Sequence, residues 1–383
     1  MAPGRTSPTS LVGVQASTTA STKDQGHRML ALRTRRIYLT ASAAARMLPR
    51  GTTGGEVAMI RLVGAATAAA VLSISGIFTS PALAKTVAPG HTWAVQAGSA
   101  LTFDGGPGPR GVGNRFYPAA IAIHQGDSIR FTPIGPHTIT YNRPAGPVFA
   151  MFAPSGGTTL ANPSATLNSG FIGAGPGTFT VTFASTLPAG RYNFICALHL
   201  GMKATVDVMP AGADLPKVDA DYAAIAQAQV TRDLATAGRV SAAATEDLED
   251  EDGNATVLVG AGTKRVSNLR FFPAALTVRV GQTVTFLKTK DPTEPHTVSF
   301  NLPDGLDPVA ELLAMGGSTF DGKGVASSGF LSTKEQYAYY QLNGTPLPVA
   351  MTKYSLTFTK AGDFKYVCAL HDGAGMFAEI HVR

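Results

Sequence analysis

The 383-residue sequence predicts an all-β protein made of two tandem domains of the same fold, joined by a partly helical, acidic linker. Three observations support this prediction. A set of motifs occurs twice in the same order. The segments between them alternate apolar and polar residues, as half-buried strands do. Glycine (42) and proline (25) are abundant, as expected where many short strands meet in turns.

The duplication relates residues 116–208 to residues 271–382. Each copy has an aromatic-Pro-Ala-Ala segment, then a glycine ten positions after its leading Phe, then an alternating strand. Pro-His-Thr, Ser-Gly-Phe and an aromatic strand running into Cys-Ala-Leu-His follow. The corresponding pairs are Phe116 with Phe271, Gly126 with Gly281, Phe131 with Phe286, His137 with His296, Phe171 with Phe330, and Cys196 with Cys368. Because the order is kept, this is a duplicated domain rather than a short repeat array.

The repeat sets the predicted domain boundaries. These are a leader and signal peptide over 1–84, a first domain over 85–210, a linker over 211–253 and a second domain over 254–383. The linker is poor in β-branched and aromatic residues, and Asp219–Ala237 has the composition of a helix with one apolar face. The acidic run Glu246–Asp252 is interpreted as solvated linker.

The N-terminal region predicts export. Arg61 precedes the apolar, Ala-rich run Leu62–Phe78, and a Pro-Ala-Leu-Ala segment then ends at Ala84. This pattern is typical of a secretory signal peptide cleaved after Ala84, which would deliver the protein to the periplasm, the cell envelope or the medium. An uncleaved run would instead anchor the chain in a membrane. Either Met1 or Met59 serves as the start.

The net charge of +6 comes from the leader. Residues 1–84 hold nine of the 31 basic and two of the 25 acidic residues, so 85–383 hold 22 and 23, a net charge of −1. No basic patch remains after export, and the composition therefore argues against nucleic acid as a partner.

Cys196 and Cys368 are the only cysteines. Two cysteines in an exported protein suggest one disulfide by default. Here each cysteine opens the same Cys-Ala-Leu-His sequence, with a methionine shortly after it. A shared disulfide does not explain that duplication, so the cysteines are interpreted as members of two separate sites.

Each half supplies an early histidine and a later cysteine, histidine and methionine. The two sets are His137, Cys196, His199 and Met202, and His296, Cys368, His371 and Met376. Two imidazoles and a thiolate in a trigonal set, with a weak axial thioether, define a type 1 copper site. Zinc normally takes four strong nitrogen or sulfur ligands. The sequence therefore predicts two copper ions, one in each domain.

At these residues the chain resembles the plastocyanin/azurin family of cupredoxins, over most of 100–209 and 255–383. The second half has the ligand-loop spacing of plastocyanin, and the first has the shorter spacing of amicyanin. The resemblance implies a Greek-key β-sandwich in each domain, with the metal at one end and the eight residues above as ligands.

Two departures from the family pattern affect the surroundings of the ligands. The residue after the first histidine is Thr138 or Thr297, where family members often have Asn. The residue before the second histidine is Leu198 or Leu370, where Pro is common. Neither change removes a ligand, but both are expected to alter the groups that tune the reduction potential.

These features predict an exported electron carrier that exchanges single electrons between Cu(I) and Cu(II), with redox proteins as donor and acceptor, and no enzymatic activity. His199 and His371, placed on an exposed loop, are the expected electron ports. A catalytic copper needs further imidazoles. Outside the ligands and the leader, only His91, His124 and His381 remain, and no His-x-His occurs. His124 is expected to face solvent and His381 to be structural.

Two alternatives stay open. A two-domain copper oxidase or nitrite reductase would require the three remaining histidines to converge at a domain or subunit interface. A copper storage or delivery protein would hold labile metal and show little blue colour.

Overall fold

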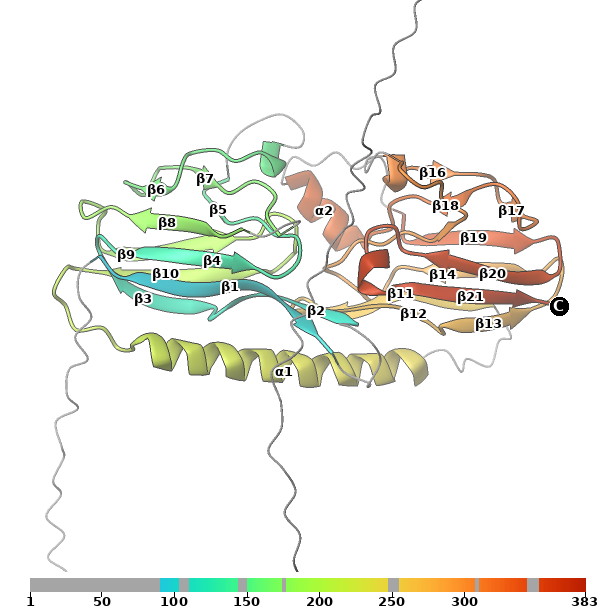
Figure 1. Cartoon of the computed structure of the whole chain (residues 1–383), viewed down its shortest axis with the longest axis horizontal. Helices are drawn as coiled ribbons and strands as arrows, with labels where there is room; N and C mark the ends of the chain where they lie inside the picture. Colours follow the sequence, from blue (N-terminus) through green and yellow to red (C-terminus); the bar gives the residue numbers. More distant parts are fainter. Residues whose placement is uncertain are drawn as a thin grey trace, which may run out of the picture. The chain divides into compact units, whose positions relative to one another are not determined.

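The computed structural model describes residues 90–102, 110–143, 150–173, 177–246, 255–306, 310–342 and 351–383 (Figure 1). All of these residues belong to one compact unit. The predicted signal peptide and residues 247–252 of the acidic run lie outside the described residues. In the part of the chain that is described, no helix has the length and apolar character needed to span a membrane.

The first domain is built from two sheets. Its strands are β1 (Thr92–Leu101), β2 (Gly111–Tyr117), β3 (Ala120–His124), β4 (Ser128–Pro133), β5 (Thr140–Tyr141), β6 (Thr159–Leu160), β7 (Leu167–Asn168), β8 (Phe179–Phe183), β9 (Gly190–Ile195) and β10 (Lys203–Met209), with a short 3-10 helix, η1 (Ala150–Phe152). One sheet has the order β3-β10-β9-β5-β7, and the remaining strands form the other sheet.

The second domain repeats this arrangement. Its strands are β11 (Thr256–Thr263), β12 (Val266–Phe272), β13 (Ala275–Val278), β14 (Thr283–Leu287), β15 (Ser299–Phe300), β16 (Ala314–Met315), β17 (Thr319–Phe320), β18 (Ala326–Ser328), β19 (Lys353–Phe358), β20 (Gly362–Val367) and β21 (Phe377–Val382). Its helices are η2 (Ala310–Leu312), α2 (Lys334–Leu342) and η3 (Asp372–Ala374). The parallel pairs β1–β4 and β3–β10 recur as β11–β14 and β13–β21. The predicted all-β class is confirmed.

Alternation in the sequence places each core. In β10, Ala204, Val206 and Val208 are buried, while Lys203 points to solvent. Aromatic rings from both sheets fill the space between them. In the first domain, Phe131 lies between Phe116 and Phe194, with ring centroids 5.8 and 5.9 Å away. Such large apolar side chains supply most of the burial that stabilises a sandwich.

One sheet continues from the first domain into the second. Strand β2 pairs antiparallel with β12, so that Gly113 lies opposite Val266 and Gly111 opposite Asn268. The shared sheet therefore has the order β17-β19-β14-β11-β12-β2-β1-β4-β8-β6 (Figure 1). The repeat alone does not predict this pairing, because each copy has its own complete set of strands.

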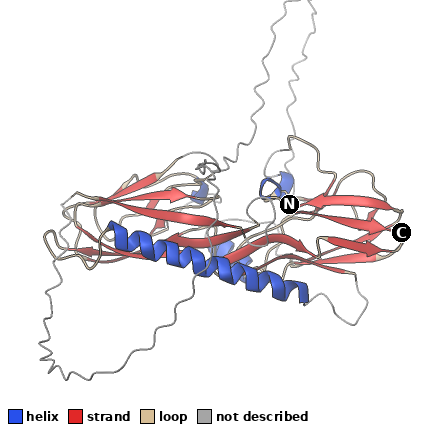
Figure 2. Cartoon of the chain, turned by 60° about the horizontal axis from the view of Figure 1, so that its bottom comes forward, coloured by secondary structure: helices blue, strands red, loops and turns tan. Residues whose placement is uncertain are grey.

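The predicted linker helix forms and is longer than expected. α1 (Asp219–Glu246) runs past Ala237 and takes in the first residue of the acidic run. It packs on β1 and β2 of the first domain and on β11 and β12 of the second (Figure 2). The Tyr117 hydroxyl donates to Asp233 at 2.8 Å. The helix therefore packs against both domains and stabilises their arrangement, instead of crossing solvent between them.

Candidate metal centres

The first group of metal-ligating side chains lies at one end of the first domain. Strand β9 ends just before Cys196, and the loop that follows carries His199 before β10 begins. His137 comes from the loop after β4. Its Nδ1 lies 3.0 Å from Nδ1 of His199, and the Cys196 Sγ lies 3.4 Å from His199 Nδ1 and 3.8 Å from His137 Nδ1. All three side chains are buried.

The second domain has the same group at the corresponding place. Cys368 follows β20, and His371 lies at the start of η3, before β21. Nδ1 of His296 is 3.2 Å from Nδ1 of His371, and the Cys368 Sγ is 3.7 Å from the first of these atoms and 3.4 Å from the second. In each group the three donor atoms lie close enough together for one ion to contact all of them.

Met202 and Met376 end the two ligand loops. Both side chains are buried in the core beside their sites. The Cys196 N–H donates to the Met202 carbonyl at 3.0 Å, and the Cys368 N–H donates to the Met376 carbonyl at the same distance. These hydrogen bonds close each loop so that its cysteine and methionine lie together. The axial role of the two thioethers stays a prediction.

The electrostatics of both groups favour thiolate. Burial alone would raise the pKa of Cys196, but the two imidazoles of its site outweigh burial and hold that pKa well below its usual value. The imidazoles of the second site likewise lower the pKa of Cys368 to about 5, against the effect of burial. A thiolate is the form of cysteine that binds metal. The donors therefore fit a soft cation such as copper.

Thr138 and Thr297, the residues after the first histidine of each set, connect the two ligand-bearing loops of their domains. The Ala197 N–H donates to Oγ1 of Thr138 at 2.8 Å, and the Ala369 N–H donates to Oγ1 of Thr297 at 2.8 Å. Their own backbone N–H groups donate to the cysteine sulfurs at 3.4 and 3.3 Å. Threonine therefore fixes the separation of the ligands, and the N–H donors stabilise negative charge on sulfur.

Two glycines that the repeat alignment did not single out lie against the ligand histidines. Gly98 and Gly260 occupy matching bulges in β1 and β11, at φ +79° and +75°. A Cβ at Gly98 would overlap Nε2 of His137, and one at Gly260 would overlap Nε2 of His296. Glycine is required at both positions because the backbone conformation and the close approach each exclude a side chain.

A buried glutamate links the two groups. Glu294 Oε1 lies 3.1 Å from Nε2 of His199 in the first domain, and its Oε2 lies 3.4 Å from Nε2 of His371 in the second. Asn114 Nδ2 donates to the same carboxylate at 2.9 Å. Burial would raise the pKa of Glu294, but His199 and His371 hold it well below its usual value. This carboxylate was not among the predicted site residues.

The sequence does contain a signal for Glu294. Six positions separate Phe131 from His137, whereas ten separate Phe286 from His296. The longer loop carries the charged residues Lys288, Lys290, Asp291 and Glu294. All but Lys290 are fully or almost fully buried. The extra charged residues next to the ligand His296 indicate that this loop contributes to the metal site.

Asp291 makes the two sites unequal. Its Oδ2 lies 3.0 Å from Nε2 of His296. The matching Nε2 of His137 faces a neutral acceptor, the Ile134 carbonyl, at 3.2 Å. Despite burial, the pKa of Asp291 falls to about 2 because Lys288 and His296 lie beside it. The carboxylate is therefore ionised, and His296 of the second site has a negative partner where His137 of the first site has a neutral one.

Two predictions about exposure are wrong. His199 is 3% exposed and the His371 side chain 11%, so neither presents the open edge expected of an electron port. Packing of the domains against each other covers both. His124, expected to face solvent, is 3% exposed, and its Nε2 lies 2.7 Å from the Ala213 carbonyl.

The other two histidines outside the ligand sets also have local partners. Nε2 of His91 lies 2.9 Å from Asp219 at the start of α1. Nδ1 of His381 on β21 lies 2.7 Å from Asp363 on β20. Neither belongs to a group of metal-ligating side chains found among the described residues.

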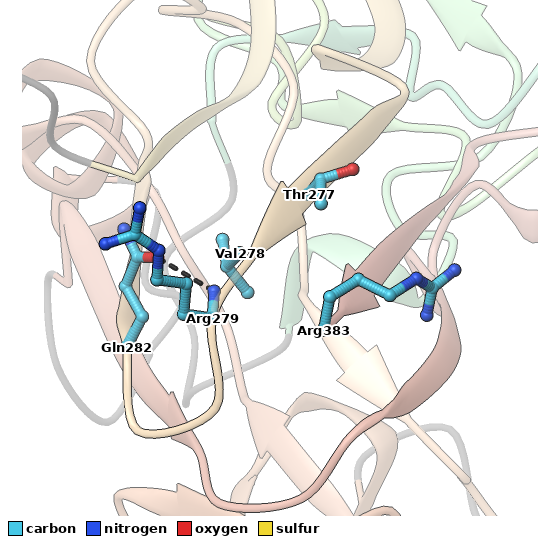
Figure 3. A pocket seen from close by; sticks show the side chains of 5 residues that line it. All are labelled: Thr277, Val278, Arg279, Gln282 and Arg383. Carbon is cyan, nitrogen blue, oxygen red and sulfur yellow. Dashed lines mark hydrogen bonds between the residues drawn. The ribbon is translucent and has the colours of Figure 1, made fainter.

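An open hollow of about 680 Å³ lies in the second domain, lined by Thr277, Val278, Arg279, Gln282 and Arg383 (Figure 3). Gln282 accepts a hydrogen bond from the Arg279 backbone at 3.0 Å. The Arg383 guanidinium is paired with Asp363 at 2.6 Å. No predicted metal ligand is among the described residues that line this hollow, so it is separate from the metal centres.

Residues 255–383 match the family described as copper binding proteins, plastocyanin/azurin family. The second domain is a cupredoxin. The matched residues include His296, Cys368 and His371, the donors that converge in this domain. The first domain repeats the strand pairings of the cupredoxin and has its own His–Cys–His group.

Plastocyanins and amicyanins are among the solved structures similar to part of the chain. They include a mutant plastocyanin of fern and the oxidised form of plastocyanin from Dryopteris crassirhizoma, each 22% identical, covering 34% of this chain and 100% of that one, with a TM-score of 0.21. A mutant of amicyanin in its Cu(I) form is 24% identical and covers 35% of this chain and 87% of its own, with a TM-score of 0.20. No curated protein matches the chain significantly.

Proposed function

We propose that the protein is an exported electron carrier that binds one type 1 copper ion in each of two cupredoxin domains. One observation carries the proposal: the same buried trio of two Nδ1 atoms and one Sγ is built twice, with separations of 3.0–3.8 Å in the first domain and 3.2–3.7 Å in the second. Copper bound there supplies a one-electron couple between Cu(I) and Cu(II).

The chain's own residues hold and shield the metal. Cys196 and Cys368 would supply the thiolates, and the two imidazoles beside each would supply nitrogen donors. Met202 and Met376 would supply the thioethers. The Thr138 and Thr297 hydrogen bonds keep the ligand loops at one spacing. Such outer hydrogen bonds orient ligands and tune the metal, and a site held in one geometry needs little rearrangement when an electron arrives.

The positions of the remaining histidines favour a carrier over an oxidase or nitrite reductase. His91, His124 and His381 contact Asp219, the Ala213 carbonyl and Asp363. A catalytic copper would need several such imidazoles around one vacant position. We therefore expect no turnover of nitrite or phenols by fully copper-loaded protein. Turnover that is lost in His124→Ala or His381→Ala would overturn the carrier proposal.

The geometry also favours a carrier over a storage or delivery protein. The low exposure of both trios and the closure of both ligand loops support tightly held metal. A stoichiometric reductive titration tests this directly: the copper-loaded protein should take up two electrons reversibly, lose its thiolate-to-copper colour and retain its metal. Rapid loss of copper to a soluble chelator in either oxidation state would favour storage or delivery.

A basic surface beside the first ligand loop is a candidate docking site for a redox partner. The net charge of −1 over residues 85–383 predicted no basic patch, but the fold gathers basic residues that are far apart in the sequence. A hollow of about 500 Å³ is lined by Arg115, Arg232, Arg239, Lys264 and Arg265, together with Asp233. The Lys264 side chain lies next to Gly201 of the ligand loop. Opposite charge steers association between proteins. We propose an acidic redox protein as the partner, docking outside the cytoplasm.

A further inference from the structure

We propose that Glu294 connects the two metal sites, so that one electron passes between the domains through His199, the Glu294 carboxylate and His371. The inference rests on the proposed function, since it requires copper in both sites. With this path, the two metal sites exchange electrons with each other and do not act as independent carriers joined in tandem.

The contacts form an unbroken path between the two cysteine sulfurs. Cys196 Sγ is 3.4 Å from Nδ1 of His199, whose Nε2 is 3.1 Å from Glu294 Oε1. Glu294 Oε2 is 3.4 Å from Nε2 of His371, whose Nδ1 is 3.4 Å from Cys368 Sγ. Each imidazole therefore faces its own thiolate with Nδ1 and the shared carboxylate with Nε2.

The chemistry of the groups fixes the direction of the hydrogen bonds. When Nδ1 of each histidine binds a metal, Nε2 carries the proton and donates it. An ionised carboxylate accepts at both oxygens, so Glu294 can accept from both imidazoles at once. Hydrogen bonds with an ionised acceptor are stronger than neutral ones. One glutamate is thus sufficient to orient a ligand in each domain.

Burial and asymmetry indicate that this position is specialised. Glu294 is 4% exposed, and Asn114 of the first domain donates to it at 2.9 Å. In the repeat, Glu294 corresponds to Gly135, and Asn114 corresponds to Leu269. Each domain therefore contributes one half of the bridge, and neither half is duplicated. A buried carboxylate with partners in both domains forms only when the domains pack together.

The proposed transfer is balanced within the protein. One electron leaves Cu(I) at one site, which becomes Cu(II), and reduces Cu(II) at the other site to Cu(I). No bond forms or breaks, and no proton moves, because Glu294 accepts hydrogen bonds from both imidazoles before and after the transfer. No external oxidant or reductant is needed for this step.

Two substitutions of Glu294 separate its chemistry from its size. In Glu294→Gln the amide keeps one acceptor oxygen but places an NH₂ donor against the other imidazole donor, so one hydrogen bond is lost. Glu294→Asp keeps the charge and both acceptors but shortens the reach by one methylene. Two controls accompany them. Glu335→Gln makes the same change at an exposed position, and Tyr339→Phe removes another interdomain hydrogen bond, from Tyr339 Oη to the Cys196 carbonyl at 2.6 Å.

The first readout is independent of electron transfer. In protein loaded with Cu(I), proton NMR should show slowly exchanging Nε2–H resonances of both His199 and His371. Both Glu294 variants should lose or shift at least one of them, and both controls should keep them. The second readout is the first-order rate at which an electron redistributes between sites after flash reduction. That rate should fall about 10–100-fold in the Glu294 variants, the range typical for loss of a group that orients a ligand.

The outcomes distinguish this inference from the proposed function. If both sites bind copper and are blue, but the Glu294 variants keep both resonances and the wild-type rate, the inference is overturned and the carrier proposal stands. A selective loss of rate in Tyr339→Phe would also overturn it, because the path would run through α2. Wild-type protein that fills only one site would overturn both.

Discussion

At the scale of single residues, the main difference between the two sites is the partner of one ligand imidazole. His296 faces the ionised Asp291, whereas His137 faces a neutral backbone carbonyl. A carboxylate partner increases the basicity of a ligand histidine and favours the more highly charged metal. The second site should therefore have the lower reduction potential, and in an internally coupled pair the first site should hold the electron at equilibrium.

We expect Asp291→Asn to raise the reduction potential of the second site and leave the first site unchanged. For a one-electron couple, each tenfold loss of preference for Cu(II) raises the potential by about 60 mV. Asp321→Asn is the matched control, because Asp321 is exposed in the same domain. A redox titration followed by visible absorption measures both potentials. An unchanged second potential would show that Asp291 does not tune the metal.

Gly98 and Gly260 allow a sharper test of site geometry. Gly98→Ala should remove copper from the first site alone, and Gly260→Ala from the second alone, because each Cβ would displace a ligand imidazole. Gly281→Ala is the control: it has φ +86° but open space around its Cβ. It should keep both coppers and lose only about 1–2 kcal/mol of stability from backbone strain. Metal analysis of the purified variants would contradict this account if Gly98→Ala and Gly260→Ala each retained two coppers.

Sequence patterns predicted which two histidines and which cysteine come together in each domain, but they did not predict the groups that surround these side chains. The spacing of Cys, His and Met after an aromatic strand is local, and the repeat shows it twice. Glu294, in contrast, acts on His199 of the other domain, and that contact depends on how the domains pack. His199 and His371 have low exposure for the same reason, because both contact Glu294 where the domains meet.

At the scale of elements, α1 is the part whose role differs most from its predicted one. Its composition predicted a helix correctly, because Tyr222, Val230 and Leu234 share an apolar face. Buried polar contacts then fix it in place. Tyr117 Oη donates to Asp233, which is 4% exposed, and Asn268 Nδ2 donates to the Ala237 carbonyl at 3.1 Å. The pattern of apolar residues indicated that one face of α1 packs against other elements. It did not indicate that strands of both domains form this contact.

Asp233→Ala should therefore destabilise the whole protein. The change removes the acceptor of the buried Tyr117 hydroxyl and the partner of Arg115 at 3.7 Å. Loss of a buried hydrogen-bond partner costs about 1–3 kcal/mol. Chemical denaturation of metal-free protein measures the free energy of unfolding, with Gln227→Ala on the exposed face of α1 as the control. Equal stability of the two variants would show that α1 is only a tether.

At the scale of the whole molecule, the tandem repeat has become a single unit. The β2–β12 pairing continues one sheet through both domains, α1 packs across strands of both, and Glu294 contacts a ligand from each. The duplication predicted two copies of a fold and two sets of donors. The longer loop before His296 and the helix α2 differ between the copies, and they add the Glu294 and Tyr339 contacts to those made by α1 and the β2–β12 pairing. A repeat alignment emphasises what is shared, and so it passes over these residues.

The most direct test of the central claim, two type 1 copper sites in one chain, is the copper-to-protein ratio measured together with the visible spectrum. We predict two coppers and intense thiolate-to-copper absorption for the wild type. Cys196→Ser and Cys368→Ser should each leave one copper and about half of the colour, because each thiolate belongs to one site. A colourless, zinc-loaded protein from a copper-rich preparation, or loss of all colour in either single variant, would contradict the account.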